Sequence, residues 1–134
     1  GFVEEETVRG IRLADDNYDR HGPGGLEKYH GAKTRAVFKS WSETWMSEWF
    51  ATWNIEAALP AISCPVLVVQ GENDEYGTVK QVKAITGQVK GRCESRIVRH
   101  CGHTPHREHP AALLDLLADF IGRLIDEPAS FDTG

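Results

Sequence analysis

The pattern of apolar and polar positions changes near Pro60. Residues 3–59 are helical in pattern, interrupted by Gly-Pro-Gly-Gly at 22–25 and again near Asn54. Three consecutive glutamates near the start suit the positive end of a helix dipole. A first helical segment is predicted from Val3 to Tyr18, and a second helical region from about Leu26 to Trp53.

After Pro60 the chain alternates between strand and helix patterns. Residues 62–70 form a continuous apolar run rich in β-branched residues, typical of a strand buried on both faces in a parallel sheet. The segment between Pro110 and Pro128 repeats apolar residues at steps of three and four, typical of an amphipathic helix. The predicted order is strand 62–70, helix 78–90, strand 94–99 and helix 111–125. This order indicates the α/β fold class.

Two parallel strands do not complete a sheet. Both faces and at least one edge of a central strand would lie open, and open strand edges pair readily with other chains. We therefore expect a second copy of the chain, or a partner chain, to cover the exposed strand edges.

Composition narrows the function classes. The net charge of −5 over 134 residues argues against a nucleic-acid partner, because such partners are bound by neutralising phosphates. No apolar run reaches the length of a membrane span. The three cysteines, Cys64, Cys93 and Cys101, form no C-x-x-C pair, which favours a reduced, cytoplasmic protein. No motif indicates a cofactor.

Two short signatures place an acid and a base directly after the predicted strands. Gly-Glu-Asn-Asp ends at Asp74, and Cys-Gly-His-Thr-Pro has His103 at its centre. Carboxyl ends of parallel strands share one edge of the sheet, where ligands bind in open α/β folds. Histidine can take and return a proton near neutral pH, while a carboxylate fixes its tautomer. Glu72 and Glu75 are alternative acids, but the distance from the strand favours Asp74.

These signatures, in this order, resemble the acid turn and the histidine loop of the α/β-hydrolase superfamily, in particular its members with a helical lid. The resemblance implies that residues 1–60 form the lid and 61–134 the C-terminal β-α-β-α part of the core, an incomplete α/β-hydrolase fold. It further implies that Asp74 is the acid and His103 the general base of a Ser-His-Asp triad.

The nucleophile of that triad has no counterpart here. The family's elbow is G-x-S-x-G, earlier in the chain than the acid and the histidine. None of the serines has glycine two residues away on either side, and Cys93 has only Gly91 before it. The serines are Ser40, Ser42, Ser47, Ser63, Ser95 and Ser130. The chain alone is therefore expected to be inactive.

Two function classes remain open. In the first, the chain is the C-terminal part of a lidded serine hydrolase. Once completed by an N-terminal half, it would hydrolyse an ester or related acyl bond of a small apolar or aromatic substrate. Alternatively, it is a non-catalytic hydrolase remnant that dimerises and serves as a binding module.

Aromatic residues recur every fourth position in the second predicted helix. Trp41, Trp45, Trp49 and Trp53 span a broad stripe, which suits packing within the lid or an aromatic wall over a substrate pocket. We assign Trp41, Trp45 and Trp49, with Tyr76 beside the acid turn, to substrate binding.

A metal site is the third alternative. His100, His103, His106, His109 and Cys101 are residue types that bind zinc. However, Pro105 and Pro110 interrupt the run, and no H-E-x-x-H or paired-cysteine pattern is present. We predict no metal site, and expect Glu108 to cap or orient the histidine loop.

Overall fold

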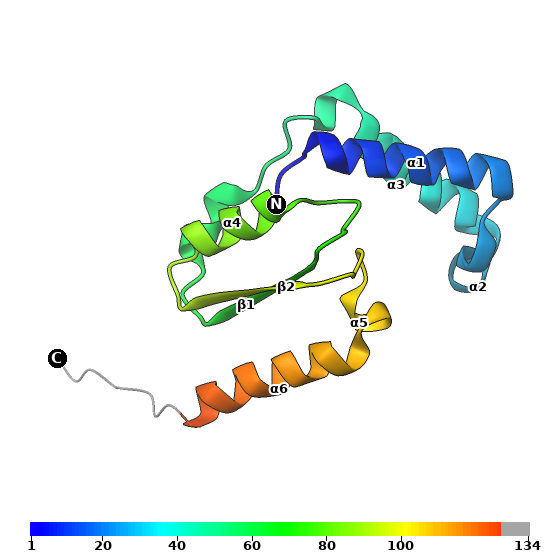
Figure 1. The fold of residues 1–134 in the computed structure, drawn as a ribbon. Coiled ribbons are helices and arrows are strands. Elements are labelled where there is room, and N and C mark those ends of the chain that lie inside the picture. Colours follow the sequence, from blue (N-terminus) through cyan, green and yellow to red (C-terminus); the bar gives the residue numbers. More distant parts are fainter. Residues whose placement is uncertain (127–134) are drawn as a thin grey trace.

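The structure is a computed structural model that describes residues 1–126; the predicted helix stop Pro128, and Ser130, lie outside the described residues. The first half is helical, and the second half carries the sheet (Figure 1). The helices before the sheet, with η marking a 3-10 helix, are α1 (Glu5–His21), η1 (Gly24–Leu26), α2 (Glu27–His30), η2 (Gly31–Lys33), α3 (Thr34–Met46), η3 (Glu48–Phe50) and η4 (Glu56–Ala61). The later elements are β1 (Val66–Gly71), α4 (Val79–Gln88), β2 (Cys93–Val98), α5 (Pro105–Glu108) and α6 (Pro110–Asp126).

The second predicted helical region, about 26–53, is divided into several helices. α2 ends where Gly31 takes a φ of 52°, and α3 ends where Ser47 turns to extended backbone with ψ 147°. The Ser47 hydroxyl donates to the carbonyl of Thr44 at 2.6 Å, which closes the last turn of α3. Consequently, Trp49 lies in the short helix η3 rather than on α3.

The predicted order strand–helix–strand–helix is confirmed. β1 and β2 pair in parallel, from Val66 opposite Cys93 to Gly71 opposite Val98. The first strand begins at Val66, four residues later than predicted. Pro65 has no N–H to donate, and the carbonyl of Ile62 accepts N–H groups from the turn before β2 instead of joining a ladder.

Helices lie on both sides of this two-stranded sheet, with α4 on one side and α6 on the other (Figure 1). Within residues 1–126 no further strand pairs with β1 or β2. The side chains of β1 from Val66 to Gln70 are therefore only half-buried, and not buried on both faces as predicted.

Helix α6 also leaves part of its apolar surface uncovered. Phe120 is buried, whereas a second apolar stripe on the same helix is exposed. This exposed stripe comprises Leu114 (65% exposed), Leu117 (38%), Ile121 (52%) and Ile125 (76%). Large apolar side chains in one contiguous row are typical of a surface that another polypeptide covers.

A polar cluster and an aromatic stack join α1 to α3. The buried hydroxyl of Ser42 donates to Asp15 at 2.6 Å, and Lys39 donates to both oxygens of the same carboxylate at 3.0 Å. Tyr18 stacks on Phe38 with ring centroids 4.2 Å apart. The hydrogen bond from Ser42 is the main reason why the pKa of Asp15 lies below its usual value.

The start of the helical half is tied to α4. The side chain of Glu4 is 3% exposed and accepts the N–H of Thr78 at 3.1 Å and its hydroxyl at 2.7 Å. Gln81 donates to the carbonyl of Phe2 at 2.9 Å. Burial opposes ionisation of Glu4, but the hydrogen bonds from Thr78 and Gln81 outweigh it and lower the pKa of the carboxyl. Helix α1 is thereby fixed beside the first turn of α4.

Candidate active site

The two signature loops lie against each other at the carboxyl ends of β1 and β2. The N–H of Asn73 donates to the carbonyl of Cys101 at 2.8 Å, which joins the loops beyond the last strand pair. A Cβ on Gly71 would lie 2.0 Å from the carbonyl oxygen of Gly102, so only glycine allows this close approach. The parallel pairing predicted from sequence therefore brings the acid turn and the histidine loop together.

Asp74 and His103 form a hydrogen-bonded pair. Nδ1 of His103 lies 3.0 Å from Oδ1 of Asp74, and the side chains are 53% and 12% exposed, respectively. An ionised carboxylate can only accept, so the imidazole donates from Nδ1. On the neutral ring this leaves Nε2 as a proton acceptor, and within residues 1–126 it has no hydrogen-bond partner. In such a pair the carboxylate can orient the imidazole as a base and stabilise its protonated form.

Tyr76 contacts both members of this pair. Its N–H donates to Oδ1 of Asp74 at 2.9 Å, closing a tight turn, and its ring meets the imidazole of His103 edge-on with centroids 4.8 Å apart. Burial, and then the negative charges of Glu75 and Asp74, raise the pKa of the Tyr76 phenol. The phenol therefore stays neutral beside the pair.

Glu108 fixes the shape of the histidine loop. Its carboxylate accepts the N–H of Gly102 at 2.7 Å, the N–H of Thr104 at 3.0 Å and the Thr104 hydroxyl at 2.9 Å. These bonds bracket His103 on both sides. They lower the pKa of Glu108, the bond from Gly102 contributing most. The expected orienting role of Glu108 agrees with this geometry.

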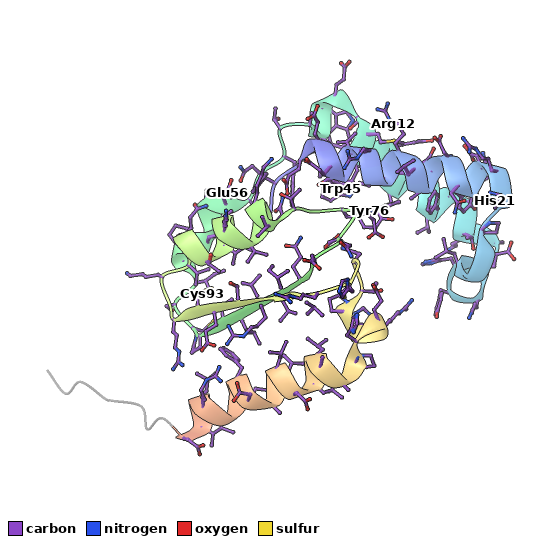
Figure 2. All side chains as sticks on the ribbon, viewed as in Figure 1. Arg12, His21, Trp45, Glu56, Tyr76 and Cys93 are labelled. Carbon is purple, nitrogen blue, oxygen red and sulfur yellow. The ribbon has the colours of Figure 1, made fainter. Side chains whose placement is uncertain are left out.

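A mostly apolar pocket of about 350 Å³ opens beside the pair and includes both Asp74 and His103 in its lining. Trp45 and Tyr76 both line it, and Figure 2 shows them close together between the helical half and the sheet. Other side chains of the lining include Phe2, Trp53, Val68 and Ile85. A base beside an apolar pocket is an arrangement suited to small apolar ligands.

The remaining aromatic residues assigned from sequence lie elsewhere. Trp41 is outside this pocket but meets the Tyr76 ring edge-on at 6.2 Å, and it lines a second apolar pocket of about 290 Å³ in the helical half. Trp49 is 73% exposed and lines neither pocket. The structure thus brings Trp45 and Tyr76 to the pair, Trp41 to its periphery, and leaves Trp49 on the surface.

Phe2 and Trp53 are pocket residues that sequence reasoning missed. Trp53 carried a usable signal, since it continues the four-residue spacing of the tryptophans, and it packs on Trp45 at 5.5 Å. Phe2 carried none, because an isolated bridge with Asn54 brings the start of the chain to the site.

Among residues 1–126 no group of three or more His, Cys, Asp or Glu side chains is arranged to hold a metal ion. In the same part of the chain, no helix is both long and apolar enough to cross a membrane.

Comparison with known proteins identifies the fold. Solved structures of α/β-hydrolases match the chain at low sequence identity. A membrane phospholipase A described as a bacterial virulence factor matches with 18% identity and a TM-score of 0.65, over 94% of this chain and 47% of its own. A serine hydrolase of carbazole degradation matches with 18% identity and a TM-score of 0.61, over 90% and 49%. A thermophilic esterase from Thermogutta terrifontis matches with 19% identity and a TM-score of 0.53, over 92% of this chain and 52% of its own.

The chain therefore has part of an α/β-hydrolase fold and spans about half the length of these structures. No protein-family profile matches it, and no curated protein does.

Proposed function

We propose that the chain supplies the acid and the general base of a serine hydrolase, and that a segment outside these 134 residues supplies the nucleophile. The hydrogen bond between Nδ1 of His103 and Oδ1 of Asp74, beside an apolar pocket, carries the proposal. The structural neighbours described as a phospholipase, a serine hydrolase and an esterase support it. The helices before η4 serve as the lid.

The proposed reaction is hydrolysis of an ester or related acyl bond. Nε2 of His103 takes the proton of the serine hydroxyl as the oxygen attacks the acyl carbon, and returns it to the leaving alcohol. Asp74 holds the ring in the tautomer that leaves Nε2 free, and stabilises the imidazolium formed in between. A water molecule then repeats the cycle on the acyl-enzyme. Trp45, Tyr76 and Trp53 receive a small apolar or aromatic part of the substrate.

Three features support a completing segment. The serines of this chain lack the flanking glycines of the elbow, β1 and β2 have no third strand in the described part of the chain, and α6 exposes an apolar stripe. A segment that adds strands to the sheet and covers α6 would bring the nucleophile to the edge where Asp74 and His103 lie.

A fluorophosphonate probe with intact-mass readout tests the proposal. The chain alone should gain no label. Expressed together with the sequence encoded upstream, or with a co-purifying partner that contains G-x-S-x-G, it should give a complex labelled on that serine. In this complex His103→Gln should lower the rate of ester hydrolysis by roughly 10³-fold or more. His106→Gln, which changes an exposed histidine of the adjacent helix α5, is the matched control and should change this rate less than twofold. Full activity of the His103 variant would refute the assignment.

The same open edge and exposed stripe favour a second candidate, a non-catalytic module in which two copies pair. Here the chain alone forms a stable dimer, and no combination with a serine-bearing segment hydrolyses esters. Sedimentation velocity of the purified chain, combined with the labelling experiment, separates the two candidates. A monomer that becomes labelled only when completed favours the hydrolase.

A further inference from the structure

Helix α1 makes an unusually close contact with the acid turn. Gly10 lies inside this helix and is buried, and a Cβ there would sit 2.1 Å from the carbonyl oxygen of Glu75. Alanine is favoured over glycine in a helix interior, so glycine at this position serves the contact and not the helix. The backbone of the acid turn therefore rests directly on α1.

One residue further along the turn, α1 also makes a hydrogen bond. The Thr7 side chain is buried, and its hydroxyl donates to the carbonyl of Tyr76 at 2.6 Å. The N–H of Tyr76 in turn donates to the oxygen of Asp74 that accepts from His103. A continuous series of hydrogen bonds thus runs from Thr7 through Tyr76 and Asp74 to the imidazole.

The far end of the turn is held as well. Glu4, which precedes α1, accepts the N–H and the hydroxyl of Thr78. Residues 74–78 are therefore fixed between β1 and α4 at their ends, and by Thr7 and Gly10 in the middle. Without the middle contacts the turn could shift, and Oδ1 of Asp74 would leave the line of Nδ1.

We infer that Thr7 and Gly10 are positioning residues for the Asp74–His103 pair, so that the first turns of α1, within the proposed lid, also hold the acid turn in place. This inference rests on the proposed function. It predicts that the imidazole of His103 keeps its Nδ1–H tautomer only while the acid turn is docked on α1.

The imidazole nitrogens report the tautomer directly by ¹⁵N NMR at alkaline pH, where an imidazole is neutral, on the 134-residue chain without substrate. His103→Gln assigns the signals among the other histidines. Thr7→Val, which keeps the shape but removes the hydroxyl, should lower the Nδ1–H to Nε2–H ratio of His103 at least twofold. Gly10→Ala should do the same. Thr7→Ser, which restores the donor, and Gly122→Ala, a helical glycine with open space around it, should keep the wild-type ratio.

A loss of stability alone would leave the tautomer of the folded protein unchanged. If folded Thr7→Val and Gly10→Ala both keep the wild-type ratio, the inference is wrong while the proposed function stands. If Gly10→Ala does not fold, the contrast between Thr7→Val and Thr7→Ser decides. A wild-type chain without a preference for Nδ1–H would overturn both, because the Asp74–His103 bond would not exist.

Discussion

The carboxylate of Glu108 accepts a hydrogen bond from the backbone N–H of Gly102 at 2.7 Å, directly before His103. With two further bonds from Thr104, it closes the loop around His103. The histidine is thus held through the backbone on either side of it, while its ring remains half exposed. Removing this carboxylate should therefore destabilise mainly the loop that contains His103.

Glu108→Gln should lower the stability of the chain in a pH-dependent manner. The folded-state pKa of Glu108 lies below its usual value of 4.5, so its contribution is fully present above 4.5 and is lost as the pH falls through the folded-state value. Urea unfolding should show a gap between wild type and variant at neutral pH, and the gap should close in acid. A gap that is constant across this range would show that the charge on Glu108 does not hold the loop.

Ser42→Ala should weaken the contact between α1 and α3. The variant removes a buried donor to Asp15, and hydrogen bonds to charged groups contribute about 1.5–3 kcal/mol. The free energy of unfolding should fall by about that amount at neutral pH. Because the pKa of Asp15 is lowered in the folded chain, this contribution is fully present above the usual value of 3.8 and is lost as the pH falls through the lower folded-state value.

Ser40→Ala is the matched control for this prediction. Ser40 lies on the same helix, two residues away and exposed, so its removal should change the free energy of unfolding by less than about 0.5 kcal/mol. Equal effects of both substitutions would mean that helix propensity, and not the bond to Asp15, sets the result.

The sequence predicted the proximity of Asp74 and His103 better than the position of the aromatic residues around them. Asp74 and His103 could be paired in advance because each follows a strand, and adjacent parallel strands end at the same edge. The aromatic assignments relied instead on a four-residue spacing along one helix. That helix ends at Met46. Trp45 still lies on it and lines the pocket, whereas Trp49 lies in the separate helix η3 and is exposed. Thr7 and Phe2 contact residues that are 69 and 79 positions away along the chain, and no local pattern predicts such contacts.

Trp45→Ala should weaken binding of a small apolar ligand at the pocket. The indole forms part of the pocket lining together with Tyr76, and its removal deletes a large contact surface. In an NMR titration with phenyl butyrate, an uncharged ester, the dissociation constant should rise at least threefold. Trp49→Ala should leave it unchanged, because that indole is on the surface. Equal weakening by both variants would place the ligand on the exposed aromatic surface instead.

Charged residues on the exposed stripe of α6 should block the completion of the fold without unfolding the chain. Leu114 and Ile121 are 65% and 52% exposed, so Leu114→Glu and Ile121→Glu should each cost less than about 0.5 kcal/mol of stability in the chain alone. A buried, unpaired carboxylate is costly, however, and the double variant should lose its complex with the serine-bearing segment, measured by co-purification and by fluorophosphonate labelling. Leu13→Glu changes a residue of similar exposure (64%) on α1 and should retain the complex. If the Leu114–Ile121 variant assembles and labels like wild type, the completing segment does not cover α6, and its contact with the sheet must lie at an open strand edge instead.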